Sequence, residues 1–148
     1  MVTTNNNLDW LDPRKAEFRL GELAALFFQD GIQIVAGWRT AGVAMALTVA
    51  KHIACAMQRT DVGFACLESG ADGQGYITDT VRALVQGKKI LVVTDRLGSG
   101  DRLALGLVVD ELKASGATGI FVGVLENDDG ALPDGAADQV RVKSLVKK

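Results

Sequence analysis

The segment ILVVTDRLGSGDRL, residues 90–103, combines residue types that could bind a phosphate group. An apolar run ends at Asp95, and Gly98-Ser99-Gly100 then precede a sequence with the pattern of a helix. A strand that turns through small residues into a helix exposes successive backbone N–H groups, to which the positive end of the helix dipole adds. Such a loop favours an anion of about the size of phosphate. Asp95 could hold a ribose hydroxyl or, through water, a magnesium ion.

Asp101 gives the same loop a second interpretation. As an N-cap for the helix expected over 101–116, its carboxylate would occupy N–H groups that a phosphate needs. Beside a bound phosphate it would repel the ligand, unless Arg96 or Arg102 offset its charge. The loop by itself therefore leaves phosphate binding and a purely structural turn as alternatives.

A second glycine-bearing loop, GWRTAG at 37–42, follows another short apolar run. Arg39 within it is a cation at the start of an expected helix and could bind pyrophosphate. An arginine at this place could equally be a surface residue that packs its stem on Trp38. Both interpretations stay open on the sequence alone.

Strands and helices in alternation must position these two loops. We expect strands at 32–38, 54–58, 62–67, 89–95, 119–127 and 139–146, helices at 15–29, 40–53 and 101–116, and a short helix or turn over 78–89. Continuous apolar runs indicate strands that are covered on both faces, while 139–146 alternates like an edge strand. The sequence therefore predicts a mainly parallel α/β sheet flanked by helices, with ligands beyond the carboxyl ends of the strands.

Composition excludes several other classes of protein. The 148 residues suit a single domain, 48% of them are hydrophobic, 23% are charged, and the formal net charge is -2. These values argue against a disordered or fibrous chain and against binding to nucleic acid or to an anionic membrane. No apolar stretch approaches the roughly 20 residues that span a bilayer, and the first residues lack a signal-peptide pattern. We therefore expect a cytoplasmic protein with Cys55 and Cys66 as reduced core thiols.

The order of elements from residue 32 to about 127 resembles that of the type I phosphoribosyltransferases, most closely the orotate phosphoribosyltransferases. The segment IVAGWRTAGVAMALTVA is similar to the family's first strand, pyrophosphate loop and following helix. The segment VQGKKILVVTDRLGSGDRLALGLVVDELKASGATGIFVGVLEN is similar to its next strand, phosphoribosyl-pyrophosphate loop, helix and strand. The resemblance implies one phosphoribosyltransferase-like domain over 1–148, with an N-terminal helix and short hood at 1–31 and the core at 32–148.

The resemblance also implies roles for both loops. Contacts to phosphoribosyl pyrophosphate or to a nucleotide phosphate would fall on Asp95, Arg96, Gly98, Ser99, Gly100 and Asp101, and the pyrophosphate loop on Gly37, Trp38, Arg39 and Thr40. Asp95 would orient the ribose and help to hold a magnesium ion, and the small residues would hold the 5′-phosphate. The implied reaction transfers ribose 5-phosphate to a small nitrogenous base, which is a glycosyltransferase activity.

Three departures from the family pattern support an alternative. Thr94 replaces the first acid of the family's acidic pair, and Asp101 stands where the family usually has a hydroxyl residue. The glycine-rich loop at 68–76 carries Glu68 and Asp72, whereas the orotate enzymes close a cation-rich loop over the departing pyrophosphate. The sequence therefore also fits a non-catalytic binding or regulatory protein of this fold, or a purely structural assembly protein. Because the hood is short, we expect a homodimer in every case.

Overall fold

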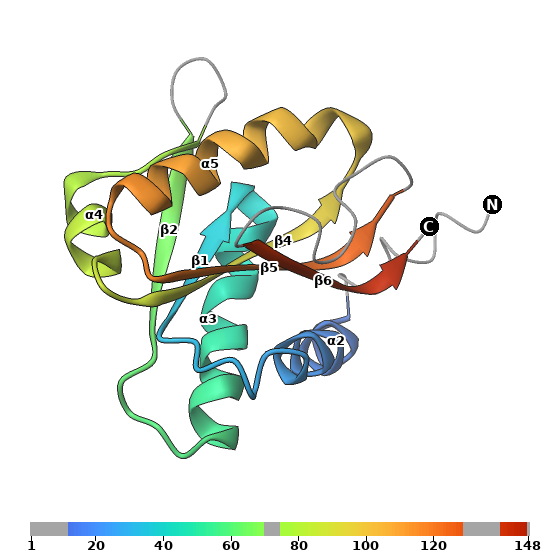
Figure 1. Ribbon diagram of the computed structural model, residues 1–148. Helices are drawn as coiled ribbons and strands as arrows, with labels where there is room; N and C mark the ends of the chain where they lie inside the picture. Colours follow the sequence, from blue (N-terminus) through green and yellow to red (C-terminus); the bar gives the residue numbers. More distant parts are fainter. Residues whose placement is uncertain (1–11, 70–74, 129–139, 148) are drawn as a thin grey trace.

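Five parallel strands form the centre of the molecule, in the order β2-β1-β4-β5-β6. The computed structural model describes residues 12–69, 75–128 and 140–147. The strands are β1 (Ile34–Trp38), β2 (Gly63–Ser69), β4 (Lys89–Leu97), β5 (Gly119–Asn127) and β6 (Val140–Lys147), and the short β3 (Gly75–Tyr76) pairs antiparallel with β2. The predicted α/β architecture with a mainly parallel sheet is confirmed (Figure 1).

Helices cover both faces of this sheet. One face carries α2 (Pro13–Ala25) and α3 (Arg39–Ala56), and the other carries α4 (Asp79–Val85) and α5 (Arg102–Ala114) (Figure 1). Successive side chains of a strand point to opposite faces. Accordingly Val92 belongs to the core beneath α5, whereas its neighbours Leu91 and Val93 belong to the core beneath α2 and α3. Both faces of β4 are therefore buried, as its continuous apolar run indicates.

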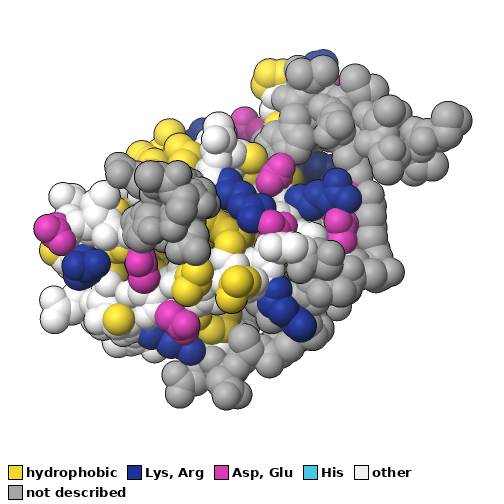
Figure 2. Space-filling view, turned by 90° about the horizontal axis from the view of Figure 1, so that it is seen from above, with side chains coloured by type: hydrophobic (Ala, Val, Ile, Leu, Met, Phe, Trp, Pro, Cys, Tyr) yellow, Lys and Arg dark blue, Asp and Glu magenta, His cyan; other side chains and the backbone are white. Residues whose placement is uncertain are grey.

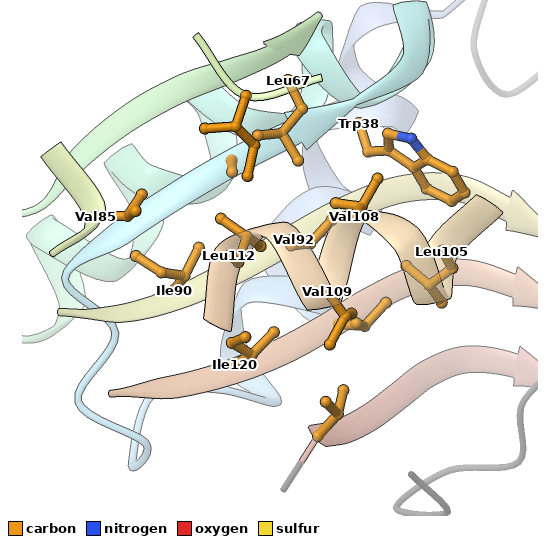
Figure 3. Packing of buried hydrophobic residues seen from close by; sticks show 14 of the residues in the cluster. Trp38, Leu67, Val85, Ile90, Val92, Leu105, Val108, Val109, Leu112 and Ile120 are labelled. Carbon is orange, nitrogen blue, oxygen red and sulfur yellow. The ribbon is translucent and has the colours of Figure 1, made fainter. Parts of the chain in front are cut away.

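The inner face of α5 anchors that helix on the sheet. Leu105, Val108 and Leu112 recur at helical spacing and are at most 1% exposed. Figure 3 shows them facing the strands that carry Val92 and Ile120. Burying a side chain of this size stabilises the fold by roughly 1.5–3 kcal/mol. This packing fixes the start of α5 next to the carboxyl end of β4, where the phosphate loop was predicted.

The structure corrects three predicted boundaries. Residues 54–58 form no strand, because α3 continues to Ala56 before the chain turns. A short apolar run fits a helix as well as a strand, and its alanines favour continuing the helix. α2 ends at Ala25 rather than at 29. β4 runs on to Leu97, so Asp95 lies inside the strand and the loop begins at Gly98.

Several side chains differ from expectation in their burial. Within the helix predicted at 15–29, Leu23 and Phe27 are fully buried, whereas Phe18 is 70% exposed. The cysteines are free thiols, but Cys55 is exposed and Cys66 half-buried, so neither is a core thiol. None of the described helices has the length and apolar character needed to cross a membrane.

Candidate functional site

The two loops singled out in the sequence meet at the carboxyl ends of β1 and β4, which are neighbours in the sheet. β1 ends at Trp38, and Arg39 begins α3. After β4, the 3-10 turn η1 (Ser99–Asp101) leads directly into α5. Arg39 and Asp101, which are 62 residues apart in sequence, are thereby brought into contact.

Close packing of α3 against the sheet determines where Arg39 lies. A Cβ atom on Gly37 would stand 2.4 Å from the carbonyl oxygen of Gly42, a distance that real Cβ atoms do not adopt. The two glycines of the GWRTAG segment therefore allow backbone to touch backbone. The result is a first helical turn held tightly at the carboxyl end of β1, with Arg39 half-buried and Thr40 exposed on it.

Arg39 combines a strained backbone with a well-packed side chain. Its φ angle is 68°, in the left-handed region that side chains other than glycine rarely adopt. Its guanidinium lies over the buried indole of Trp38, 4.1 Å from the ring centroid. The stacking on Trp38 that the sequence suggested is present, and the same guanidinium also donates a hydrogen bond to Oδ1 of Asp101. Strained residues of this kind concentrate at functional sites.

Asp101 reaches back into its own loop. Its Oδ2 accepts a hydrogen bond from the backbone N–H of Gly98 at 2.7 Å, and its backbone N–H donates to the Gly98 carbonyl oxygen at 3.0 Å. Asp101 is the N-cap residue of α5, as predicted, but its side chain makes no capping hydrogen bond to that helix. Instead, the carboxylate closes the loop that precedes the helix.

The negative charge of the Asp101 carboxylate is stabilised mainly by Arg39. The hydrogen bond from its guanidinium holds the pKa of the Asp101 carboxyl below the usual range, and the Gly98 amide and Arg96 act in the same direction. The sequence suggested Arg96 or Arg102 as the offsetting cation. The main partner comes from the other loop because the fold places α3 beside η1.

Arg96 pairs mainly with a residue at the end of β5. Its Nε and Nη2 atoms each lie 2.8 Å from Oδ2 of Asp128, and this pairing raises the pKa of Arg96. Glu126, which is 8% exposed, is the register partner of Arg96 on β5. Glu126 is not among the predicted site residues, although an acid within the apolar run 119–127 is an unusual feature of the sequence.

The resulting surface alternates in charge. Figure 2 shows one face of the molecule on which Lys or Arg side chains lie against Asp or Glu side chains. Neither sign of charge forms a continuous patch among the described residues on that face. The charges on this face are therefore arranged in pairs and do not create one overall field.

The described residues around Asp95 do not form a metal site by themselves. Thr94 is fully buried, and its hydroxyl oxygen lies 3.5 Å from Oδ1 of the half-buried Asp95. In the part of the chain that the structure describes, no three His, Cys, Asp or Glu side chains come together as metal ligands. Magnesium usually binds through one or two carboxylates together with phosphates of the substrate. Asp95 could contribute to such a shared site only when a phosphate ligand is present.

The glycines of the predicted phosphate loop are accessible to solvent. Gly98 is half-buried, Gly100 is exposed, and a Cβ on Gly100 would meet nothing within 4 Å. Ser99 begins η1, and Asp72 of the glycine-rich 68–76 loop lies outside the described residues. A hollow of about 420 Å³ borders Gly100 and continues along the outer face of α5. A larger hollow, of about 690 Å³, lies between α2 and β6 and is lined by neither loop.

Comparison with known proteins supports the fold. No family model and no curated protein matches the sequence. The chain is similar to the solved structure of adenine phosphoribosyltransferase from Rhodothermus marinus, with a TM-score of 0.69, 15% identity, and coverage of 93% of this chain and 81% of that chain. Purine phosphoribosyltransferase from Pyrococcus horikoshii is also similar, with a TM-score of 0.62, 17% identity, and coverage of 90% and 83%.

A third similar structure is a hypothetical protein from Neisseria gonorrhoeae with bound ppGpp. Its TM-score is 0.58 at 17% identity, with coverage of 90% of this chain and 81% of that chain. At these identities the likeness establishes the phosphoribosyltransferase-like fold.

Proposed function

We propose that this protein binds phosphoribosyl pyrophosphate or a nucleotide through a phosphate held between the loops 37–42 and 98–101. The observation that carries the proposal is the pair of donors around the Asp101 carboxylate. The Arg39 guanidinium and the Gly98 backbone N–H, from two separate loops, converge on one anionic group. A guanidinium together with loop amides is a donor set that also suits phosphate.

The other residues named from the sequence take roles around that phosphate. The amides from Gly98 through Gly100 would hold the 5′-phosphate, and Arg39, steadied by Trp38 beneath it, would contact the pyrophosphate. Asp95 would hold a ribose hydroxyl and share a magnesium ion with the ligand phosphates. The fold likeness supports this choice of ligand, and so does the ppGpp bound to one similar structure.

Binding without transfer is the form of the proposal that the geometry favours. Thr94 is buried and uncharged where a second acid would help to bind ribose or metal. The 68–76 segment contains Glu68 and Asp72 and no basic residue, so it offers no cation to the departing pyrophosphate. A regulatory or ligand-sensing protein catalyses no transfer, so it needs neither a second acid at position 94 nor a cation-rich loop at 68–76.

Transfer of ribose 5-phosphate is the second candidate, and the fold of the similar phosphoribosyltransferases favours it. In that reaction a ring nitrogen of the base forms a bond to C1 of the ribose. The bond from C1 to the pyrophosphate oxygen breaks, its electron pair leaves with pyrophosphate, and the base loses its proton to water. The sequence resemblance favours orotate as the base, whereas two of the similar structures are of purine and adenine enzymes. The protein is incubated with phosphoribosyl pyrophosphate, magnesium and one base at a time: orotate, adenine, hypoxanthine or guanine. Release of pyrophosphate that depends on the base shows transfer, and its absence leaves binding alone.

The first test is calorimetric titration of the protein with phosphoribosyl pyrophosphate and magnesium. We expect micromolar binding that weakens by at least about tenfold, or about 1.4 kcal/mol, in Asp95→Ala. The exposed Asp110 of α5 supplies the control, because Asp110→Ala removes the same charge away from both loops. No heat at millimolar ligand, or equal weakening in both variants, would contradict the proposed site.

The homodimer expected from the sequence remains a proposal. Light scattering coupled to size-exclusion chromatography tests it directly, because a dimer has twice the 15.6 kDa mass of the chain. A mass that stays at the monomer value at all accessible concentrations would contradict it.

A further inference from the structure

Both carboxylate oxygens of Asp101 are engaged within the protein. Oδ2 accepts the Gly98 N–H at 2.7 Å, and Oδ1 accepts from Nη2 of Arg39. The carboxylate is therefore surrounded by a cation from one loop and an amide from the other. A bound anion would be held by the same kinds of donor, but here the anion is the side chain of Asp101.

A ligand phosphate would need these same donors. In the proposed function, Gly98 supplies an amide to the 5′-phosphate and Arg39 supplies the charge. A second carboxylate stands close to Gly98, because a Cβ placed on Gly98 would lie 3.6 Å from Oδ2 of Asp101 and 3.8 Å from Oδ2 of Asp128. A phosphate entering while Asp101 keeps its place would meet occupied donors and like charge.

The contact is nevertheless one that can open. The side chains of Arg39 and Asp101 are 37% and 23% exposed, so water can replace each partner as the pair separates. Arg39 would not lose its position, since its guanidinium also rests 4.1 Å from the centroid of the buried Trp38 ring. Rotation of the Asp101 side chain is enough to free the Gly98 amide while the cation stays in place.

We propose that Asp101 is an internal competitor for phosphate: its carboxylate occupies the anion position of the loop, and a ligand's phosphate binds only after that side chain turns away. This inference rests on the proposed function and adds the residue that controls the affinity of the site. The free protein is then mostly closed, and its measured affinity is the affinity of the open form multiplied by the open fraction.

The variant Asp101→Ser tests the inference. Serine is too short to bridge Gly98 and Arg39, and its hydroxyl can donate to a phosphate. If the open form is populated about one-tenth of the time, Asp101→Ser binds ribose 5-phosphate and phosphoribosyl pyrophosphate with magnesium about tenfold more tightly than the wild type. The matched control is Asp110→Ser, the same substitution at an exposed position roughly 13 Å further along the helix axis. It should leave both affinities unchanged.

Two further measurements guard against a variant that fails to fold. Asp101→Asn keeps the shape of the side chain, removes its charge and replaces one acceptor oxygen with an NH2 donor. It cannot accept from both Gly98 and Arg39 as the carboxylate does, so it should also bind more tightly than the wild type. In the ligand-free protein, the NMR resonance of the Gly98 amide should move in Asp101→Asn and Asp101→Ser but not in Asp110→Ser. An unchanged Gly98 resonance would show that the carboxylate does not occupy the loop, which overturns the inference whatever the ligand does.

The binding results separate the two proposals. Equal affinity in wild type and Asp101→Ser overturns the internal competitor and leaves the proposed function standing. Binding by Asp101→Ser alone supports the competitor and overturns phosphate binding as a function of the native chain. Absence of binding in the wild type and in both Asp101 variants overturns both proposals.

Discussion

Gly42 of α3 lies directly against the carbonyl group of Val93 in β4. A Cβ atom on Gly42 would stand 2.4 Å from that carbonyl oxygen. The obstacle is backbone at the centre of the sheet, which cannot move aside as a flexible side chain could. The start of α3, and with it Arg39, therefore depends on the absence of a side chain at Gly42.

This close approach predicts that Gly42→Ala is strongly destabilising. The methyl group forces α3 away from the sheet, and we expect a loss of about 3 kcal/mol or more in the free energy of unfolding. Urea denaturation measures the loss. The control is Gly106→Ala in the middle of α5, where a Cβ would meet nothing within 4 Å. That change should stabilise by up to about 1 kcal/mol, because alanine favours helix more than glycine does. Equal effects at the two glycines would contradict the packing.

The left-handed backbone of Arg39 predicts an unusual order of stability among its truncations. Arg39→Gly and Arg39→Ala both remove the guanidinium and its contacts with Trp38 and Asp101. Only glycine adopts a φ of 68° without strain. The free energy of unfolding of Arg39→Gly should therefore be about 1 kcal/mol larger than that of Arg39→Ala. In an ordinary helical position alanine would be the more stable of the two. If urea denaturation shows Arg39→Ala to be more stable than Arg39→Gly, the backbone of Arg39 is not strained.

The Arg39–Asp101 pair predicts a pH-dependent contribution to stability. Because Arg39 lowers the pKa of Asp101 in the folded state, the contribution is fully present above the unfolded value of about 3.9. It is lost as the pH falls through the lower folded-state pKa. The pair is partly exposed, so the expected contribution is about 1 kcal/mol or less. Unfolding free energies of wild type and Asp101→Asn, measured from pH 7 downwards, should differ by a constant amount until about pH 4 and then converge. Parallel curves down to pH 2 would contradict the assignment.

The packing of α5 predicts opposite outcomes for two of its leucines. Leu112 is fully buried over the sheet (Figure 3), and Leu112→Ala should cost about 2–5 kcal/mol of unfolding free energy. Leu103 is 76% exposed on the same helix, and Leu103→Ala should change stability by less than about 0.5 kcal/mol. A large loss at Leu103 in the isolated chain would mean that its exposed face is covered in solution.

Local sequence patterns were sufficient for most of the sheet. The apolar run at 119–127 matches β5 without error, and the alternating segment at 139–146 lies at an edge of the sheet as β6. Gly116, the last residue of the helix predicted at 101–116, has a φ of 92° just after α5. These features follow from periodicity and backbone preference, which act over a few residues.

The misassigned elements were those in which local preferences compete. An alanine-rich stretch at 54–58 satisfies both strand and helix patterns, and α3 extends into it because its preceding turns are already packed. Phe18 lies in the helix predicted at 15–29 yet is 70% exposed, because α2 buries Leu20, Leu23 and Ala24 instead. Which face of α2 is buried depends on elements distant in the chain.

The sequence by itself identified the two loops and their residue types, because a glycine-bearing turn after a buried strand is a local signal. It could not show that Arg39 and Asp101 form one unit, since they are 62 residues apart and meet only because β1 and β4 are neighbours. Nor could it show that the Asp101 carboxylate accepts from the Gly98 amide rather than from amides of α5, because the position of Arg39 helps to decide where that carboxylate is most stable. Tertiary structure thus decided which charges face each other. Because Coulomb attraction is strongest at contact distance, the pairing of Arg39 with Asp101 determines which donors of the two loops are open to an anion.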